Sequence, residues 1–382
     1  MTLRIIICFL STFVANGLAR FGYVVLIPIM IISGRLNENQ SIQLGIAILV
    51  GYIFGSFFIN FLKKFISLEN IAKLSFLIIS LSFFACMMES LPFIWAWLWR
   101  FFAGVASASL MILAAPLSLP YVKERFRGRI GGFIFSGIGL GAVVSGFALP
   151  FIANINIDLV WIVLGGVVFC AFILSLFSLR ILKRSKQTIH KDSKFKIPYG
   201  LWLLIISYIL NAIGYLPHTL FWVDYLVRDL NFSTLLAGSS WAFFGIGAAL
   251  GSISSGILAD KIGIKNAHIV ILFFKALSCF IAAFANDLFW LNFSIFIMGF
   301  TTTGNVTLTN ALALKIVSKK HFPTSSSFLT LAFGIFQAIF SFLFAYLLKF
   351  LDGYFWMFIF CGFCLIFSFL VLLPIKIGTL RN

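Results

Sequence analysis

The sequence predicts an all-α integral membrane protein with twelve transmembrane helices in two pseudo-symmetric six-helix bundles. Hydrophobic residues make up 62% of the 382 positions and charged residues 10%, whereas soluble domains average about 45–50% and about 25%. Apolar runs recur along the chain, each close to the roughly 20 residues that a membrane span needs. A polar, basic segment divides these runs into two groups of six.

The first apolar run extends from Ile5 to Ile32, which is too long for the core of a signal peptide and predicts a span. The spans predicted for the first half are 5–32, 42–62, 71–89, 92–118, 130–153 and 158–180. Those predicted for the second half are 199–227, 236–258, 266–285, 289–314, 323–348 and 354–375. The domains expected are an N-terminal bundle over 1–181, a cytoplasmic linker over 182–198 and a C-terminal bundle over 199–382.

The formal net charge of +17 follows from the expected topology. With the N-terminus inside, 22 of the 28 Lys and Arg residues fall in cytoplasmic segments, and the outer loops hold Arg35, Arg228 and Lys349. Lys and Arg favour the cytoplasmic side of a membrane, so we expect both termini in the cytoplasm of a bacterial-type inner membrane. The charge then requires no nucleic-acid partner, and we expect a monomer in the lipid bilayer.

An internal repeat indicates that the two halves share one design. Asn16 in the first span matches Asn211 in the seventh, 195 residues later. Gly51 and Gly55 in the second span match Gly247 and Gly251 in the eighth at an offset of 196. Small residues four apart let helices approach closely, so these glycines predict helix packing first of all. The glycine-rich fifth span is expected to make similarly tight contacts, on a face where the halves pivot.

Two motifs resemble those of the major facilitator superfamily. The loop after the eighth span is similar to the cytoplasmic loop motif of that family, and the fourth span, with Arg100 and Gly104, is similar to its fourth-helix arginine motif. The resemblance implies the family's twelve-helix fold, with helices one, four, seven and ten around a central cavity. It also implies that the loop residues latch a cytoplasmic gate, and these residues are Gly256, Asp260, Lys261 and Gly263.

The first span resembles one poorly characterised bacterial branch of the superfamily. It contains Gly17, Arg20, Phe21 and Tyr23 in the pattern GxxRFxY. The resemblance does not specify a substrate.

Ionisable residues inside a membrane are costly and therefore mark functional sites. Arg20 lies about sixteen residues, or roughly 24 Å, into the first span, and Arg100 lies in the fourth. In the family's architecture both would face the cavity. Few carboxylates are available to pair with them, because Glu89 and Asp224 lie near outer ends. Arginine binds carboxylate or phosphate through two parallel hydrogen bonds, so an anionic solute is predicted. The structural alternative is that the arginines cap carbonyl groups or pair with a carboxylate.

The seventh and tenth spans supply further candidates. Pro217 predicts a kink or break in the seventh span, where backbone lining a cavity is expected. The predicted substrate contacts are Asn16, Arg20, Tyr23, Tyr52, Arg100, Asn211, Tyr215, His218 and Asn305. His218 and Asp224 could couple proton flow to transport, or they could simply hydrogen-bond at the rim of a gate. Lys275, in the ninth span, is equally open to a structural and a functional role.

These features favour a secondary transporter that moves a small organic anion by alternating access. The anion would be a carboxylate metabolite or a polycarboxylate siderophore, and we expect its transport to be coupled to protons or another ion. A drug or metabolite exporter is the near alternative, for which a cavity rich in Phe and Trp would be the sign. An integral membrane enzyme or a sensor is disfavoured, because the sequence shows no paired carboxylates, metal-ligand cluster or output domain. No cofactor, catalytic residue or metal site is predicted.

Overall fold

The computed structural model describes residues 2–63, 65–88, 90–114, 116–118, 124–179, 197–317, 322–348, 350 and 353–375. These residues form helices and no strand, so the predicted all-α class is confirmed. All but the last two residues of the predicted linker, 182–198, lie outside this part of the chain, as do Glu89 and Lys349.

The N half contains six spans in the predicted order. The first span is composed of α1 (Thr2–Thr12), η1 (Phe13–Phe21) and α2 (Gly22–Ile32), and the others are α3 (Glu38–Leu62), α4 (Leu68–Cys86), α5 (Phe93–Ala114), α6 (Glu124–Ile155) and α7 (Ile157–Ser178). Polar side chains cap several helix starts, because the first backbone N–H groups of a helix lack partners within it. Asn37 and Gln40, for example, form a reciprocal capping box at the start of α3.

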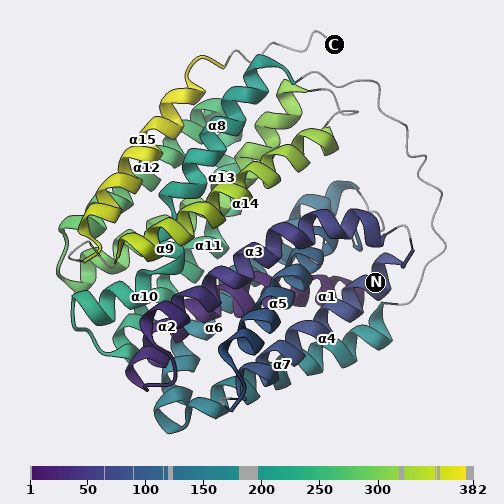
Figure 1. Cartoon of the computed structure of the whole chain (residues 1–382). Coiled ribbons are helices and arrows are strands. Elements are labelled where there is room, and N and C mark those ends of the chain that lie inside the picture. The colour runs from purple at the N-terminus through teal and green to yellow at the C-terminus, as the bar shows by residue number, and fades with distance from the viewer. Residues whose placement is uncertain are drawn as a thin grey trace.

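The C half repeats this arrangement. Its first span is composed of α8 (Tyr199–Gly214), α9 (Leu216–Leu220), α10 (Trp222–Asp224) and η3 (Tyr225–Asp229), and the others are α11 (Thr234–Ile262), α12 (Ile264–Phe284), α13 (Leu288–Ile316), α14 (Phe322–Leu347) and α15 (Phe355–Leu372). Figure 1 shows the two groups of helices side by side. We name the end of the bundle where α1 begins the terminus end, and the end where α2 finishes and α3 begins the loop end.

The first and seventh spans are both irregular near their middles. In the first span the backbone forms a nine-residue π-helix, Phe13–Phe21, instead of an α-helix. In the seventh, α8 ends at Gly214 and a new helix begins beside Pro217, which confirms the predicted break. Proline has no N–H to donate and its ring displaces the preceding turn. Irregular helical segments of this kind are frequent at functional sites.

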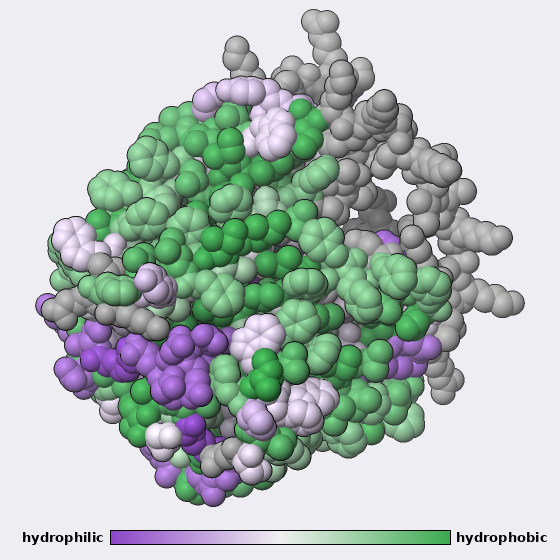
Figure 2. All heavy atoms as spheres, viewed as in Figure 1, coloured by the Kyte–Doolittle hydropathy of each residue, from purple (hydrophilic) through white to green (hydrophobic). Residues whose placement is uncertain are grey.

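Ten described helices are long and apolar enough to cross a membrane. The two remaining spans are the broken seventh and the tenth, α13, which carries a stripe of Thr and Asn side chains. Large apolar side chains cover much of the outer surface (Figure 2), and hydrophilic residues gather near the ends of α2 and α10. This surface suits lipid, which offers no partner for exposed polar groups.

The repeated glycines make equivalent contacts in the two halves. A Cβ at Gly51 would overlap the backbone of Phe101 in α5, and one at Gly247 would overlap the backbone of Phe296 in α13. The second span therefore packs on the fourth as the eighth packs on the tenth. The predicted packing role of these glycines is confirmed, and the sequence repeat corresponds to a structural one.

The halves meet along α6 and α11 toward the loop end. Gly139 lies against Gly245, and Gly146 against Gly238, so closely that a Cβ at any of them would overlap the facing backbone or a proline ring. Figure 1 shows the helices of the two halves diverging from there toward the terminus end. The glycine-rich fifth span thus provides a tight contact between the halves, as predicted.

Candidate functional site

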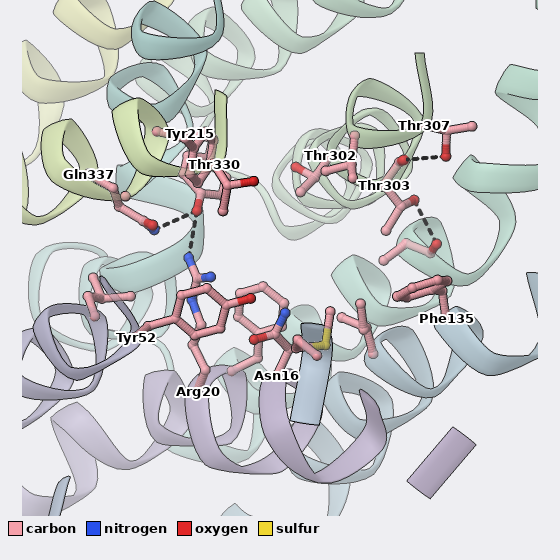
Figure 3. Close-up of a pocket in the computed structure, with 18 of the residues that line it drawn as sticks. Asn16, Arg20, Tyr52, Phe135, Tyr215, Thr302, Thr303, Thr307, Thr330 and Gln337 are labelled. Carbon is pink, nitrogen blue, oxygen red and sulfur yellow. Dashed lines mark hydrogen bonds between the residues drawn. The ribbon is translucent and has the colours of Figure 1, made fainter. Parts of the chain in front are cut away.

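A cavity of about 470 Å³ lies between the two halves. Its walls come from η1, α3, α5 and α6 of the N half and from α8, α11, α13 and α14 of the C half. Most of the lining is apolar or aromatic, and the polar groups gather at two places on opposite sides (Figure 3). Ligand cavities generally combine an apolar wall with a few placed polar groups in this way.

The first polar place is built around Arg20. Its guanidinium projects into the cavity from the π-helix, and Nη2 donates a 2.5 Å hydrogen bond to the Tyr215 hydroxyl oxygen (Figure 3). The Arg20 guanidinium carbon also lies 5.1 Å from the centroid of the Phe21 ring. Among the described residues Tyr215 is its one hydrogen-bond partner, so most of its donors remain available to a ligand.

Tyr215 is held from the C half. Its hydroxyl oxygen accepts a second hydrogen bond from Gln337, and its ring packs against Phe333 with centroids 5.4 Å apart. The ammonium nitrogen of Lys275 lies 4.9 Å from the Tyr215 ring centroid. Lys275 is fully buried and donates a 2.8 Å hydrogen bond to Asn211. Lys275 therefore lies behind the part of the cavity wall that Tyr215 forms.

The second polar place is a hydroxyl-bearing surface of α13. Thr303 donates to the backbone carbonyl of Ala248 at 2.8 Å, and Thr307 donates to that of Thr303 at 3.1 Å. The hydroxyl oxygen of Thr302 has no hydrogen-bond partner among the described residues. Asn310 of the same helix also lines the cavity, whereas Thr330 of α14 lies beside Tyr215 on the Arg20 side (Figure 3). The polar stripe predicted in the tenth span is therefore divided between helix packing and the cavity.

Four of the predicted substrate contacts line the cavity together: Asn16, Arg20, Tyr52 and Tyr215. Asn16 and Arg20 project from the same π-helix. Tyr52 comes from α3, and Tyr215 from the break in the seventh span. These four residues come from separate parts of the chain and line one cavity.

Arg100 and Tyr23 are not part of the cavity lining. Arg100 is completely buried in the N half, where Nη2 donates to the carbonyl oxygen of Ala19 at 2.8 Å. Its guanidinium carbon lies 4.5 Å from the Tyr23 ring centroid. We expected both arginines to face the cavity. Arg100 does not line it, and instead caps the irregular backbone of the first span.

Asn211, His218 and Asn305 lie outside the cavity lining and in the core of the C half. Asn211 accepts from Lys275, and Asn305 hydrogen-bonds His268. His218 lies 2.9 Å from the Ser294 hydroxyl oxygen and stacks on Trp222 with ring centroids 4.9 Å apart. These polar residues satisfy one another within the bundle, as buried polar groups generally must.

Asp224 is buried at the loop end in a network that joins the halves. It accepts a hydrogen bond from the Tyr354 hydroxyl and lies 3.1 Å from Arg228 Nε. Arg228 in turn forms a 2.7 Å ion pair with Glu38 of the N half. The side chain predicted for proton coupling thus belongs to a contact between the halves.

The predicted gating residues lie at the opposite, terminus end. Asp260 and Lys261 are exposed in the last turn of α11. Gly263 has a φ of +83°, a conformation that suits glycine because it lacks Cβ, and it lets α12 begin one residue after α11 ends. Gly256 has open space where a Cβ would be.

Several cavity residues were not predicted. Gln337 is the most important of them, because it shares the Tyr215 hydroxyl with Arg20. It is a lone amide in the apolar eleventh span, and the rule that polar residues inside a membrane mark functional sites could have found it. Tyr208, Phe244 and Phe333 also line the cavity. They give no such signal, because aromatic residues are abundant throughout this chain.

Comparisons with known proteins agree with the helical architecture. A search of the solved structures found a bacterial homolog of the human lysosomal transporter Spinster, in an inward-facing and unoccupied conformation. It superposes with a TM-score of 0.72 at 16% sequence identity, over 97% of this chain and 96% of that one. A search of curated proteins found no match.

A family model assigns the chain more specifically. The model described as "Uncharacterised MFS-type transporter YbfB" matches residues 12–373, which is nearly the whole chain. The match includes both halves and every helix that lines the cavity. The protein is therefore a transporter and not an enzyme, and it belongs to the YbfB-type family of the major facilitator superfamily.

Proposed function

We propose that this transporter moves a small organic anion by alternating access, with Arg20 as the anion-binding residue. The observation that carries the proposal is the charge of the cavity. Among the described residues that line the cavity, Arg20 is the one Arg, Lys, Asp or Glu residue. An arginine in an apolar cavity with no carboxylate beside it favours an anion, because a charge out of water needs a partner.

The form of the cavity favours one anionic group on a largely apolar body. The second arginine invoked for a polycarboxylate, Arg100, is directed at Ala19 and Tyr23 and not at the cavity. The hydroxyl-bearing surface of α13 lies across the cavity from Arg20 (Figure 3). A monocarboxylate with an apolar or aromatic body and a hydrogen-bonding far end matches this lining better than a siderophore with several carboxylates.

The distribution of Lys and Arg supports a cytoplasmic location for the terminus end. Lys and Arg concentrate in the segments expected there, and cytoplasmic loops favour these residues. The close contacts at the loop end and the divergence of the halves toward the terminus end then correspond to an inward-facing form (Figure 1). We place the protein in a bacterial inner membrane with both termini in the cytoplasm.

Proton coupling is assigned to Asp224, with His218 as the second candidate. Asp224 is buried between Tyr354 and Arg228, and Arg228 contacts the N half through Glu38. A proton on Asp224 would weaken its attraction for Arg228 and thereby the contact between the halves. If this assignment is right, Asp224→Asn abolishes uptake driven by a pH gradient and spares counterflow in proteoliposomes. A pH-driven response that survives in the double variant with His218→Gln excludes both residues.

The anion proposal is tested by binding to purified protein. Thermal stabilisation is measured with a panel of monocarboxylates and, for each acid, its neutral amide. Acids should stabilise the wild-type protein and the matching amides should not, because only the acids carry the charge that Arg20 pairs with. Arg20→Gln should remove the stabilisation, and Arg20→Lys should retain part of it, since a lysine keeps the charge without the bidentate geometry.

Arg35→Gln is the control, because Arg35 pairs with Asp158 at the loop end, away from the cavity. Equal stabilisation by acids and amides would contradict the anion assignment.

Export of neutral or cationic hydrophobic compounds is the second candidate. Four phenylalanines line the cavity, namely Phe21, Phe135, Phe244 and Phe333. The same measurement separates the two functions, because an exporter of this kind should be stabilised by apolar amines or neutral aromatics, and Arg20→Gln should leave that stabilisation unchanged.

Asp260 is proposed as a latch that holds the terminus end closed in the opposite, outward-facing form. It is exposed in the present form, as a disengaged latch would be. Asp260→Asn should increase labelling of cysteine probes placed in the last turns of α11. Unchanged labelling would leave the loop with a structural role alone.

A further inference from the structure

The hydrogen bond between Arg20 and Tyr215 joins two residues at equivalent places in the two halves. They are 195 residues apart, the same separation that relates Asn16 to Asn211 in the repeat. Under two-fold symmetry, equivalent residues that touch each other lie at the axis, because residue i contacts j just as j contacts i. The contact therefore marks the pseudo-two-fold axis between the halves.

The same contact lies near the middle of both spans. Arg20 is 18 residues after Thr2 and 12 before Ile32, and Tyr215 is 16 residues after Tyr199 and 14 before Asp229. Each residue belongs to the irregular part of its span, Arg20 to the π-helix η1 and Tyr215 to the junction of α8 and α9. The two breaks in helical structure thus face each other across the axis.

Alternating access in two-half transporters is largely rigid-body rocking of one half against the other around a fixed site. In a rigid rotation the displacement of an atom grows with its distance from the pivot. The loop-end contact of Gly146 with Gly238 must therefore separate when that end opens, whereas a contact at the centre of the bundle and on its axis moves least.

We propose that the Arg20–Tyr215 hydrogen bond is the fixed point of the transport cycle and persists whether the loop end is closed or open. Tyr215 is then a positioning residue, which holds the Arg20 guanidinium at the centre of the cavity throughout the cycle. Its surroundings suit this role, because Gln337 bonds the same hydroxyl and Lys275 and Phe333 pack on the ring. The proposal rests on the alternating-access part of the proposed function and does not depend on the substrate being an anion.

The test is a double-mutant cycle on substrate-free protein in lipid nanodiscs. Thermal unfolding is compared for wild type, Arg20→Gln, Tyr215→Phe and the double variant. The four proteins are then remade with Gly146→Trp, which forces α6 from α11 because even a Cβ there overlaps Gly238. Gly166→Trp is the control, since a Cβ at Gly166 meets nothing within 4 Å. Fluorescence energy transfer between dyes at Asn39 and Asn286, both exposed at the loop end, verifies the opening.

If the link persists, the double variant loses less stability than the sum of the two single losses, in both backgrounds. The shared loss should be about 10- to 150-fold in the unfolding equilibrium, as for a hydrogen bond to a charged group. Tyr208→Phe is the matched control, because Tyr208 lines the same cavity. Its effect on stability should simply add to that of Arg20→Gln. Tyr215→Phe should also widen the distribution of inter-half distances, which a residue with a role confined to the C half would not do.

Additive losses in the Gly146→Trp background would overturn the persistence of the link, and additive losses in the wild-type background would overturn the link itself. If Gly146→Trp does not fold, Gly139→Trp opens the same interface opposite Gly245. Loss of carboxylate binding in Arg20→Gln is a separate measurement, so failure of the anion assignment is distinguishable from failure of this proposal.

Discussion

The guanidinium of Arg228 donates a 2.7 Å hydrogen bond to the carboxylate of Glu38 and so links the two halves at the loop end. Glu38 begins the second span and Arg228 lies in η3 at the end of the seventh. Both side chains are partly exposed, at 26% for Arg228 and 44% for Glu38. Partly exposed ion pairs contribute about 0.2–1 kcal/mol, which is enough to bias an equilibrium between two conformations without locking it.

Glu38→Gln should therefore shift the protein toward a form open at the loop end. The population of that form should rise about 1.4- to 5-fold, the equivalent of losing one such pair. Energy transfer between dyes at Asn39 and Asn286 measures the shift. Asp158→Asn is the matched control, because it breaks the 2.6 Å ion pair with Arg35 inside the N half at the same end. Equal shifts in the two variants would show that the Glu38 contact has no gating role.

Arg100→Gln should reduce stability more than substrate affinity. The arginine is fully buried, donates to Ala19 and packs on the Tyr23 ring. Loss of a hydrogen bond from a charged group costs about 1.5–3 kcal/mol, which thermal unfolding in nanodiscs would detect. The folded fraction should keep carboxylate affinity within about 2-fold. A large loss of affinity without a loss of stability would instead place Arg100 at the substrate.

Alanine at Gly51 and alanine at Gly247 should destabilise the protein by similar amounts. Each Cβ would overlap backbone of the neighbouring helix, at Phe101 and Phe296 respectively. Such overpacking typically costs about 1–3 kcal/mol. Thermal unfolding of both variants can be compared with Gly166→Ala, where the new methyl group meets open space. A neutral effect at Gly247 with a large effect at Gly51 would mean that the two halves do not pack equivalently.

Asn211→Leu should be rescued by adding Lys275→Met. The single change removes the described acceptor of a fully buried ammonium, and an unpaired buried charge is expensive. The double change replaces both partners with apolar groups of similar size, which can be nearly neutral. Expression level and thermal unfolding measure the rescue. If the double variant is no more stable than Asn211→Leu, the ammonium has another partner and this account of Lys275 is wrong.

Much of the fold followed from patterns that act along the chain. Apolar run length predicted the spans because lipid requires continuous apolar helices, and Pro217 predicted the break in the seventh span because proline cannot donate to a helix. The π-helix of the first span was not predicted. Its sequence is apolar and similar to that of an ordinary span, and the contact that Arg100 makes with Ala19 within it joins distant parts of the chain.

The candidate site was predictable in part, because a sequence shows which intramembrane residues are charged. An intramembrane arginine is conspicuous in any sequence, and Arg20 indeed lines the cavity. Arg100 is equally conspicuous and lies elsewhere. A sequence shows that a charge is inside the membrane, but the rotation of its helix about the bundle axis decides what the side chain meets.

The sequence by itself determined the membrane class, the twelve spans and the twofold repeat, because hydrophobicity and glycine spacing act locally. Only the tertiary structure decided that Arg20 and Gln337 both donate to the Tyr215 hydroxyl, that Asn211 accepts from Lys275 and that Glu38 meets Arg228. Each of these contacts joins residues more than 60 positions apart, and such contacts exist only once the helices have packed at particular distances and rotations.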